Sequence, residues 1–515
     1  MNIRKILIVL LVAAVAPLAL SAQPPLWHRL EPGPYPVGFR VLWRHDFSRT
    51  WGTGSETARP VRISVWYPAD VSVRTKPMPY AGYLNVPVPD PTFDQLAKGV
   101  AQYDLDSIRN FFPGNVELLN KLLATPTSSH FEAKVSKGKF PLVVYSLGQN
   151  DHTLENIVLW EYLASHGYVV VTVPQIGTSP RRFQLLVHDP LMYEAQVRDL
   201  EFAIQQMQFE TYVDEKKLGL MGHSFGGIYS LLTAMRNNKV DALIGLDPTY
   251  MSKQPSFHYK FWEAPYYDIA NIKAPMLVLY KGIERENLRT DIVDDLKYSD
   301  RYMFEFPYAV HGDFNSSPMV TAIAPDGVDY ADREYATKFR PREAGVAAHE
   351  IVCRYVLNFL NAFLESDVQA KRFLSSTPEQ NGAAAGMIKP EMKPGLKAPT
   401  EEEFYWIIRN LGLDAAVKAF REAKTQYPHQ TIIREAAIKR IGNEAGYYGK
   451  PAEAVAVFSL YVEAYPTSAA AYRALGGAYE DAGNKDMAIR NYQRAVDIDP
   501  TDKYTKEKLQ KLRSN

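Results

Sequence analysis

Short apolar runs alternate with longer amphipathic segments over most of the chain. The runs in residues 140–148 and 168–174, FPLVVYSLG and YVVVTVP, are rich in β-branched residues and have no polar face. Between them, LENIVLWEYLASHG places Leu154, Ile157 and Val158 at helical spacing. Strands that are apolar on both faces and alternate with helices predict a mostly parallel sheet covered by helices. Strands are expected at 61–68, 140–148, 168–174, 217–224, 242–248, 274–282 and 301–310, and helices at 92–123, 154–167, 192–207 and 225–236.

The pattern changes after residue 374. Residues 375–400, SSTPEQNGAAAGMIKPEMKPGLKAPT, are rich in Pro, Gly, Ala and Lys and are typical of a linker. Beyond them the chain is helical and repetitive, which predicts an all-α repeat domain over 401–515. The expected organisation is therefore a segment 1–22, an α/β domain over 23–374, the linker and the repeats.

The repeats have a period of 34 residues. Ala454, Phe458 and Pro466 recur as Ala488, Tyr492 and Pro500. This spacing is that of tetratricopeptide repeats, helix pairs that stack into a continuous core and often grip a protein or peptide partner. The last copy also carries Tyr472, Leu475, Gly476 and Tyr479, whereas an earlier copy with Ala416, Phe420 and Pro428 is displaced by 38 residues.

The first residues have the form of a secretory signal peptide. Arg4 and Lys5 precede an apolar run, and small residues follow around Ser21 and Ala22. The run is shorter than a typical membrane-spanning helix, so we expect cleavage, export to the periplasm or medium, and no stable membrane span afterwards. An uncleaved anchor is the alternative.

Charge and cysteine content narrow the function classes. The chain has 58 basic and 58 acidic residues, and this balance argues against nucleic acid as a partner. Cys353 is the only cysteine, so no internal disulfide can form in an exported protein. It lies in an apolar helical pattern, where a buried structural thiol is expected.

The stretch LGLMGHSFGGI carries the candidate nucleophile. Gly222, Ser224 and Gly226 form G-x-S-x-G between a predicted strand and a predicted helix. In α/β-hydrolases this motif makes a tight turn that exposes a strained serine, and its neighbours must be small. We therefore predict an α/β-hydrolase fold with Ser224 as nucleophile.

A serine nucleophile needs a base, which in this fold follows it along the chain. The histidines after Ser224 are His258, His311, His349 and His429. His311 directly follows a predicted strand and opens a loop, so it is the expected base. His223 is adjacent to the serine, where side chains point apart, and is expected to be structural.

The acid has several candidates by position. Asp247 ends the first strand after the elbow, 23 residues beyond Ser224. Glu284, Glu286 and Asp291 follow the next strand, where many enzymes of this fold place the acid.

FPLVVYSLG, YLASHGYVVVTV, GHSFGG, GLDP and the histidine after the last strand together resemble the platelet-activating factor acetylhydrolase family, which is akin in fold to dienelactone hydrolases. The resemblance covers about residues 61–365. It implies serine-dependent cleavage of short or oxidised acyl chains from phospholipids, with Asp247 as the acid. Dienelactone hydrolases carry a cysteine at the elbow, and Ser224 argues against that branch.

The oxyanion hole of such an enzyme takes two backbone N–H donors. One is expected from Phe225, after the nucleophile. The other is expected from Gln149, in the loop where this chain has Leu147-Gly148 in place of the family's His-Gly. Asp151 and His152 nearby are expected to be solvated loop residues, with contact to the substrate as the alternative.

No cofactor or metal is expected. His349-Glu350 lacks the second histidine of a zincin motif, and there is no glycine-rich phosphate loop. The favoured function is an exported serine hydrolase of carboxylic esters. The alternatives are a serine peptidase or amidase with the same triad, and a scaffold in which a degenerate hydrolase carries working repeats.

Overall fold

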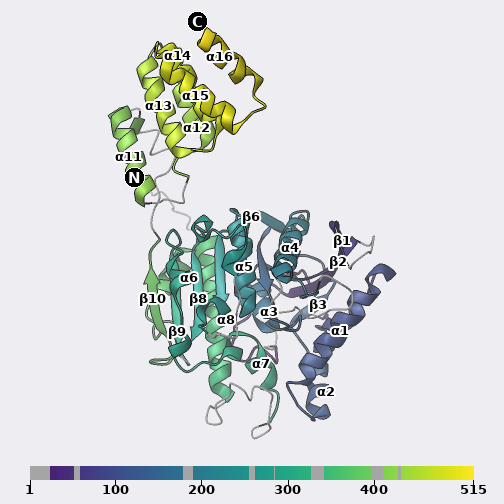
Figure 1. The fold of residues 1–515 in the computed structure, drawn as a ribbon. Helices are drawn as coiled ribbons and strands as arrows, with labels where there is room; N and C mark the ends of the chain where they lie inside the picture. Colours follow the sequence, from purple (N-terminus) through teal and green to yellow (C-terminus); the bar gives the residue numbers. More distant parts are fainter. Residues whose placement is uncertain are drawn as a thin grey trace, which may run out of the picture. The chain divides into compact units, whose positions relative to one another are not determined.

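The computed structural model describes residues 24–514 except 52–57, 73, 178–189, 254–260, 284, 326–341, 396–406, 409 and 427–430, so the expected signal segment lies outside it. The chain forms two compact units (Figure 1). The first runs to Tyr267 and takes in Ala274–Asp294 and Asp300–Lys393. The second consists of Asp268–Lys273, Asp295–Ser299 and Pro394–Asn515.

A ten-stranded sheet organises the first unit, in the order β10-β9-β8-β7-β6-β4-β5-β2-β1-β3. The six central strands, in the sheet order β5-β4-β6-β7-β8-β9, are all parallel to one another, as predicted. Strand β2 pairs antiparallel with β5, and β10 pairs antiparallel with β9. Every residue of β4, β5 and β7 is buried, because helices cover both faces of the sheet. The strands are β1 Val37–Thr50, β2 Ala58–Pro68, β3 Ser129–Phe131, β4 Phe140–Ser146, β5 Val169–Thr172, β6 Val213–His223, β7 Ala242–Leu246, β8 Met276–Lys281, β9 Arg301–Phe306 and β10 Lys389–Lys393.

The covering helices bury their apolar faces against this sheet. Helix α4 packs on α5, and α3 contacts α8. Cys353 is buried in α8, in the place expected for a structural thiol. None of the helices in the described parts of the chain combines the length and apolar character that crossing a bilayer requires. The helices of the first unit are α1 Asp94–Arg109, α2 Val116–Ala124, α3 Ile157–Ser165, α4 Pro190–Met207, α5 Phe225–Arg236, α6 Asp291–Asp294, α7 Ser317–Thr321, α8 Arg342–Leu364 and α9 Val368–Ser375.

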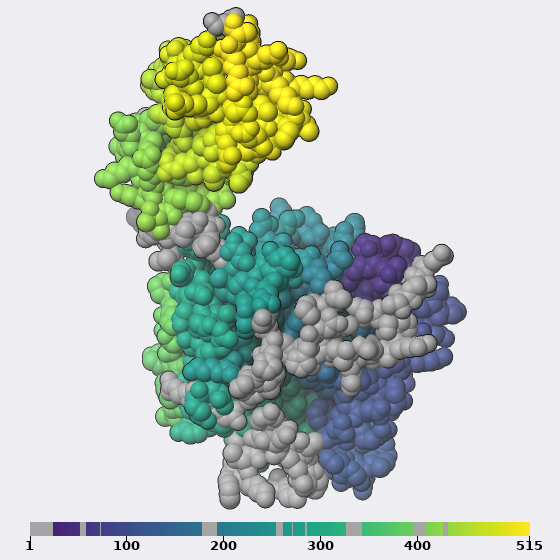
Figure 2. All heavy atoms as spheres, in the orientation of Figure 1, coloured from purple at the N-terminus to yellow at the C-terminus, as the bar shows by residue number. Residues whose placement is uncertain are grey.

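The helix expected over 92–123 is divided in two. Helix α1 ends at Arg109 and α2 begins at Val116. Pro113 and Gly114 separate them, and Gly114 has φ 71°, a conformation that ends a helix. Both helices lie on an outer flank of the first unit, coloured blue in Figure 2.

The expected linker is structured over much of its length. Residues 376–393 belong to the first unit, where Ala383 and Ile388 are buried in its core. Strand β10 then pairs antiparallel with β9 at the edge of the sheet, where Pro390 is tolerated. The division between the units therefore falls at Lys393 and Pro394, and the proline-rich composition reflects an edge strand as well as a connection.

The second unit is a stack of helices whose close contacts repeat with the sequence period. A methyl group on Gly442 would lie 2.4 Å from the Phe458 ring, and one on Gly476 would lie 2.8 Å from the Tyr492 ring. Both pairs are related by the 34-residue spacing, so each repeat uses a glycine to bring its two helices together around an aromatic ring. The helices are α11 Leu413–Gln426, α12 Glu435–Tyr447, α13 Pro451–Ala464, α14 Ala469–Asp481, α15 Lys485–Ile498 and α16 Lys503–Ser514.

Candidate active site

Ser224 stands in a strained turn between β6 and α5. Its backbone has φ 53° and ψ −121°, which L-residues rarely adopt. Its N–H donates to the carbonyl of Leu246 at 3.0 Å, and its own carbonyl accepts from the N–H of Thr249 at 3.0 Å. Strand β7 and the turn after it therefore hold the serine in this conformation.

The two motif glycines are required by close backbone contacts. A Cβ on Gly222 would lie 2.1 Å from the carbonyl oxygen of Gly226. One on Gly226 would lie 2.0 Å from the carbonyl oxygen of Ser146, at the end of β4. The elbow thus packs directly on the neighbouring strand, as the motif requires.

Asp247 and His311 meet at the same edge of the sheet. Asp247 directly follows β7, and His311 begins a short 3-10 helix, His311–Phe314, after β9. The Nδ1 atom of His311 lies 2.5 Å from Oδ2 of Asp247, and Oδ1 of Asp247 accepts from the N–H of Lys281 at 3.1 Å. With Nδ1 donating to a carboxylate, Nε2 of a neutral His311 is left as the basic nitrogen.

The electrostatics of Asp247 suit that contact. Burial by itself would raise the pKa of Asp247, but the hydrogen bond and charge of His311, together with Lys281, lower it below the usual value. Asp247 therefore stays ionised and accepts the hydrogen bond from Nδ1 of His311.

The competing acids are not brought to His311 in the described residues. Asp291 is half exposed and pairs with Arg289, whose Nε lies 2.7 Å from its carboxylate. Glu286 is exposed in a 3-10 turn, and Glu284 is outside the described residues. Among the candidate carboxylates in the described residues, Asp247 is the one whose contact with His311 is seen, at 2.5 Å.

The loop after β4 is held by side chains on both sides of Gln149. The N–H of Gly148 donates to Oε2 of Glu155 at 2.9 Å, and the N–H of Asn150 donates to Oε1 of Gln175 at 2.8 Å. Within the described residues, the N–H of Gln149 makes no such bond. Tyr103 of α1 donates to the carbonyl of Asn150, so α1 also anchors this loop.

His152 is not a solvated loop residue as expected. Its side chain is buried, its Nδ1 accepts from the N–H of Leu154 at 3.2 Å, and its ring packs on Phe111. Helix α1 and the turn after it cover this part of the loop, through Asp104 on Thr153 and Phe111 on His152, which the sequence pattern did not indicate. Asp151 is half-buried beside it.

Glu155 and His223 are a buried pair that sequence reasoning missed. Oε1 of Glu155 contacts Nδ1 of His223, and the His223 ring stacks on the His311 ring with centroids 4.5 Å apart. Glu155 begins an otherwise apolar helical pattern after the expected loop, and a charged residue in that pattern was the available signal. With Asp151, these residues bring three ligand-type atoms within 4.8 Å of one another, the one such cluster found in the described parts of the chain.

Comparison with known proteins agrees with this fold. Residues 109–260 match the family described as chlorophyllase, and residues 469–502 match the tetratricopeptide repeat. The chain therefore combines an α/β-hydrolase unit with C-terminal tetratricopeptide-type helices.

The similar curated proteins are hydrolases. Cutinase 1 of Thermobifida cellulosilytica is 24% identical over 43% of this chain and 67% of its own length, and a cutinase of Thermobifida fusca is 24% identical over 43% and 58%. A bis(hydroxyethyl) terephthalate hydrolase of Streptomyces coelicolor is 23% identical over 48% of this chain and 65% of its own length. The chain thus spans about two thirds or less of these relatives. These similarities support the assignment of the first unit as a carboxylic-ester hydrolase of the α/β-hydrolase type.

A solved structure also aligns with the chain. The ferulic acid esterase of Streptomyces cinnamoneus has a TM-score of 0.46 and 20% identity, and the match covers 69% of this chain and 96% of that one.

Proposed function

We propose that this protein is an exported serine hydrolase that cleaves carboxylic esters through Ser224, His311 and Asp247. The observation that carries the proposal is the contact of 2.5 Å between His311 and Asp247 at the sheet edge where Ser224 forms the strained elbow. His311 takes the hydroxyl proton as Ser224 attacks the acyl carbon, and returns it to the leaving alcohol. Water then releases the acyl group by the same route.

The oxyanion in this mechanism is held by two backbone donors. Phe225 begins α5, so its N–H and the helix dipole point toward developing negative charge. Gln149 is the second donor, supported by the hydrogen bonds that occupy the amides on either side of it. No step requires a cofactor.

An ester panel tests the proposal. Wild type and Ser224→Ala are assayed on esters from acetyl to long-chain acyl, on bis(hydroxyethyl) terephthalate, on a feruloyl ester and on a peptide substrate. Ser224→Ala should lose at least about 10⁴-fold in kcat and should not react with a fluorophosphonate probe. Unchanged ester hydrolysis by folded Ser224→Ala would refute the mechanism, and faster peptide than ester cleavage would favour an amidase.

We propose short acyl chains, including phospholipid-type esters, as the preferred substrates. The support is the resemblance to platelet-activating factor acetylhydrolases, together with α1, which contacts the oxyanion loop through Tyr103 and can wall in the acyl pocket. The panel should show faster cleavage of acetyl and butyryl esters than of long-chain lipids. Efficient hydrolysis of long-chain triglyceride with little activity on acetyl esters would contradict a small pocket.

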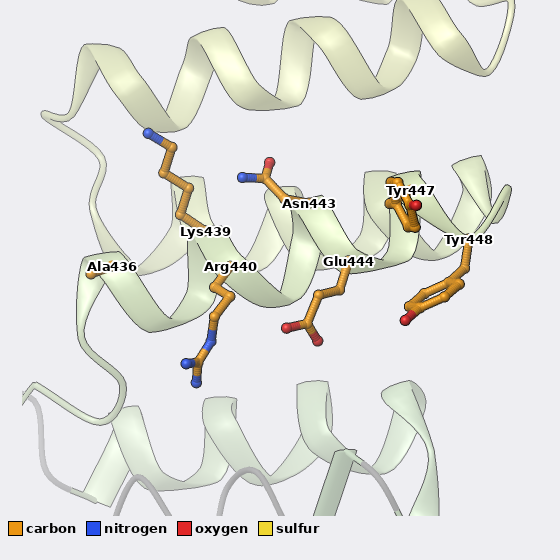
Figure 3. Close-up of a pocket in the computed structure, with 7 residues that line it drawn as sticks. All are labelled: Ala436, Lys439, Arg440, Asn443, Glu444, Tyr447 and Tyr448. Atoms are coloured by element: carbon orange, nitrogen blue, oxygen red, sulfur yellow. The ribbon is translucent and has the colours of Figure 1, made fainter.

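The repeats are proposed to bind a protein or peptide partner. A groove of about 500 Å³ runs along α12, lined by Lys439, Arg440, Asn443, Glu444, Tyr447 and other residues (Figure 3). Its mixture of charged, amide and phenol groups suits a polar peptide.

Export is proposed from the signal-like segment 1–22. N-terminal sequencing of the protein recovered outside the cytoplasm should begin near residue 23. Recovery of the intact N-terminus in the membrane fraction would favour an uncleaved anchor.

A further inference from the structure

Glu155 connects two loops of the proposed site. Its side chain is fully buried just before α3, and Oε2 accepts from Gly148 in the oxyanion loop at 2.9 Å. Its backbone carbonyl accepts from the N–H of Ser316, just after the 3-10 helix that starts at His311, at 3.0 Å. Its second carboxyl oxygen contacts Nδ1 of His223.

His223 completes the connection to His311. Its Nε2 lies 3.3 Å from the backbone carbonyl of His311, and its ring is stacked on the His311 imidazole at an interplanar angle of 28°. A carbonyl oxygen only accepts hydrogen bonds, so Nε2 of His223 carries a hydrogen. In the neutral ring, Nδ1 is then an acceptor, and the proton in the contact with Glu155 belongs to the carboxyl group.

We propose that Glu155, as a neutral carboxylic acid, and His223 are positioning residues that hold the oxyanion loop and the His311 loop in register for catalysis. Glu155 accepts from Gly148 with one oxygen and donates to His223 with the other, and His223 donates to the carbonyl of His311. The inference rests on the proposed serine-hydrolase function and adds the two residues that set its geometry.

The surroundings favour the neutral form of the pair. Burial raises the pKa of Glu155 well above its usual range, and the charge and hydrogen bonding of Asp151 raise it further. The hydrogen bond from Gly148 and the charge of His311 act in the opposite direction. Burial lowers the pKa of His223, although the negative charges of Asp151 and Asp247 act to raise it. Tyr145 of β4 and His349 of α8 also face the pair and are neutral when buried. A second negative charge beside Asp151 would further oppose the negative charge that the oxyanion loop must stabilise.

The decisive variants are Glu155→Gln and Glu155→Ala. An amide reproduces one acceptor and one donor, so Glu155→Gln should keep at least about a third of the wild-type kcat and the same pH profile of kcat/KM. Glu155→Ala should lose about 10²-fold or more in kcat with little change in KM, as when an oxyanion donor is misplaced. Its affinity for a trifluoromethyl ketone, which places an oxyanion in the hole, should fall in parallel.

Glu161→Ala is the matched control. Glu161 is a second fully buried glutamate, on α3, and it accepts hydrogen bonds from Tyr83 and Ser129 away from the elbow. Its removal should lower the melting temperature and leave the kcat of the folded enzyme within about threefold of wild type. An equal loss of kcat in both Ala variants would mean that Glu155 acts only through stability.

The remaining outcomes each decide the matter. The neutral acid would be overturned if Glu155→Gln lost as much activity as Glu155→Ala, failed to fold, or had a shifted pH profile of kcat/KM. If Glu155→Ala does not fold, the activity and pH profile of Glu155→Gln still decide this point. Loss of wild-type activity in a chelator, with recovery on adding a divalent cation, would assign Asp151, Glu155 and His223 to a metal instead. Failure of the proposed function is separate: wild type would then hydrolyse no ester and would not react with the fluorophosphonate.

Discussion

At the scale of single residues, the assignment of the acid depends on one contact. Asp247 lies 2.5 Å from His311, whereas Asp291 is half exposed and paired with Arg289. Both are aspartates after neighbouring parallel strands, so they form a matched pair for substitution.

Asp247→Asn should lower kcat by about 10⁴-fold, because the amide no longer fixes the His311 tautomer or stabilises its imidazolium. Asp291→Asn should stay within about threefold of wild type. Steady-state kinetics on a short acyl ester measure both. Near-normal activity of Asp247→Asn beside an inactive Asp291→Asn would place the acid after β8 instead.

At the scale of elements, the elbow joins β6 to α5 with almost no free space. The Cβ positions of Gly222 and Gly226 fall within about 2 Å of backbone oxygens that cannot move without shifting β4 or α5. Glycine is therefore a steric requirement there. By contrast, a Cβ on Gly446 in α12 meets nothing within 4 Å.

Gly226→Ala should destabilise the first unit by about 2 kcal/mol or more and abolish labelling of Ser224, because a methyl group would displace the β4 backbone. Gly446→Ala should be neutral or stabilise by up to about 1 kcal/mol, since alanine favours a helix. Denaturant unfolding and fluorophosphonate labelling check the pair. Wild-type labelling of Gly226→Ala would show that the elbow is looser than the structure indicates.

At the scale of the whole molecule, every proposed catalytic group lies before the end of β10. The first unit ends at Lys393, after Ala383 and Ile388 have filled its core and β10 has paired with β9. The helical repeats form their own core, which includes Phe420, Ile438, Phe458 and Leu475.

A chain ended at Pro394 should therefore keep its turnover on a small soluble ester and lose binding of a partner that the full chain captures. A chain ended at Ser375 should be less stable and lose activity, because it uncovers the edge of β9 and removes the buried residues that follow α9. Melting curves, turnover and pull-down compare the three chains. Abolished turnover in a folded chain ended at Pro394 would mean that the repeats complete the active site.

The sequence by itself determined the features that depend on local geometry. Apolar runs of strand length predicted the parallel core, the small residues around Ser224 predicted the elbow, and the 34-residue period predicted stacked helix pairs. Residues close together in the chain produce each of these signals, so no folded structure is needed to recognise them.

Only the tertiary structure decided which distant groups meet. His311 and Asp247 are 64 residues apart, and His223 and Glu155 are 68 apart. Their contacts depend on the order of the strands and on which loops share an edge of the sheet, which periodicity does not encode. The edge strand β10 was missed for the same reason, because a proline-rich segment becomes a strand only where β9 offers it an open edge.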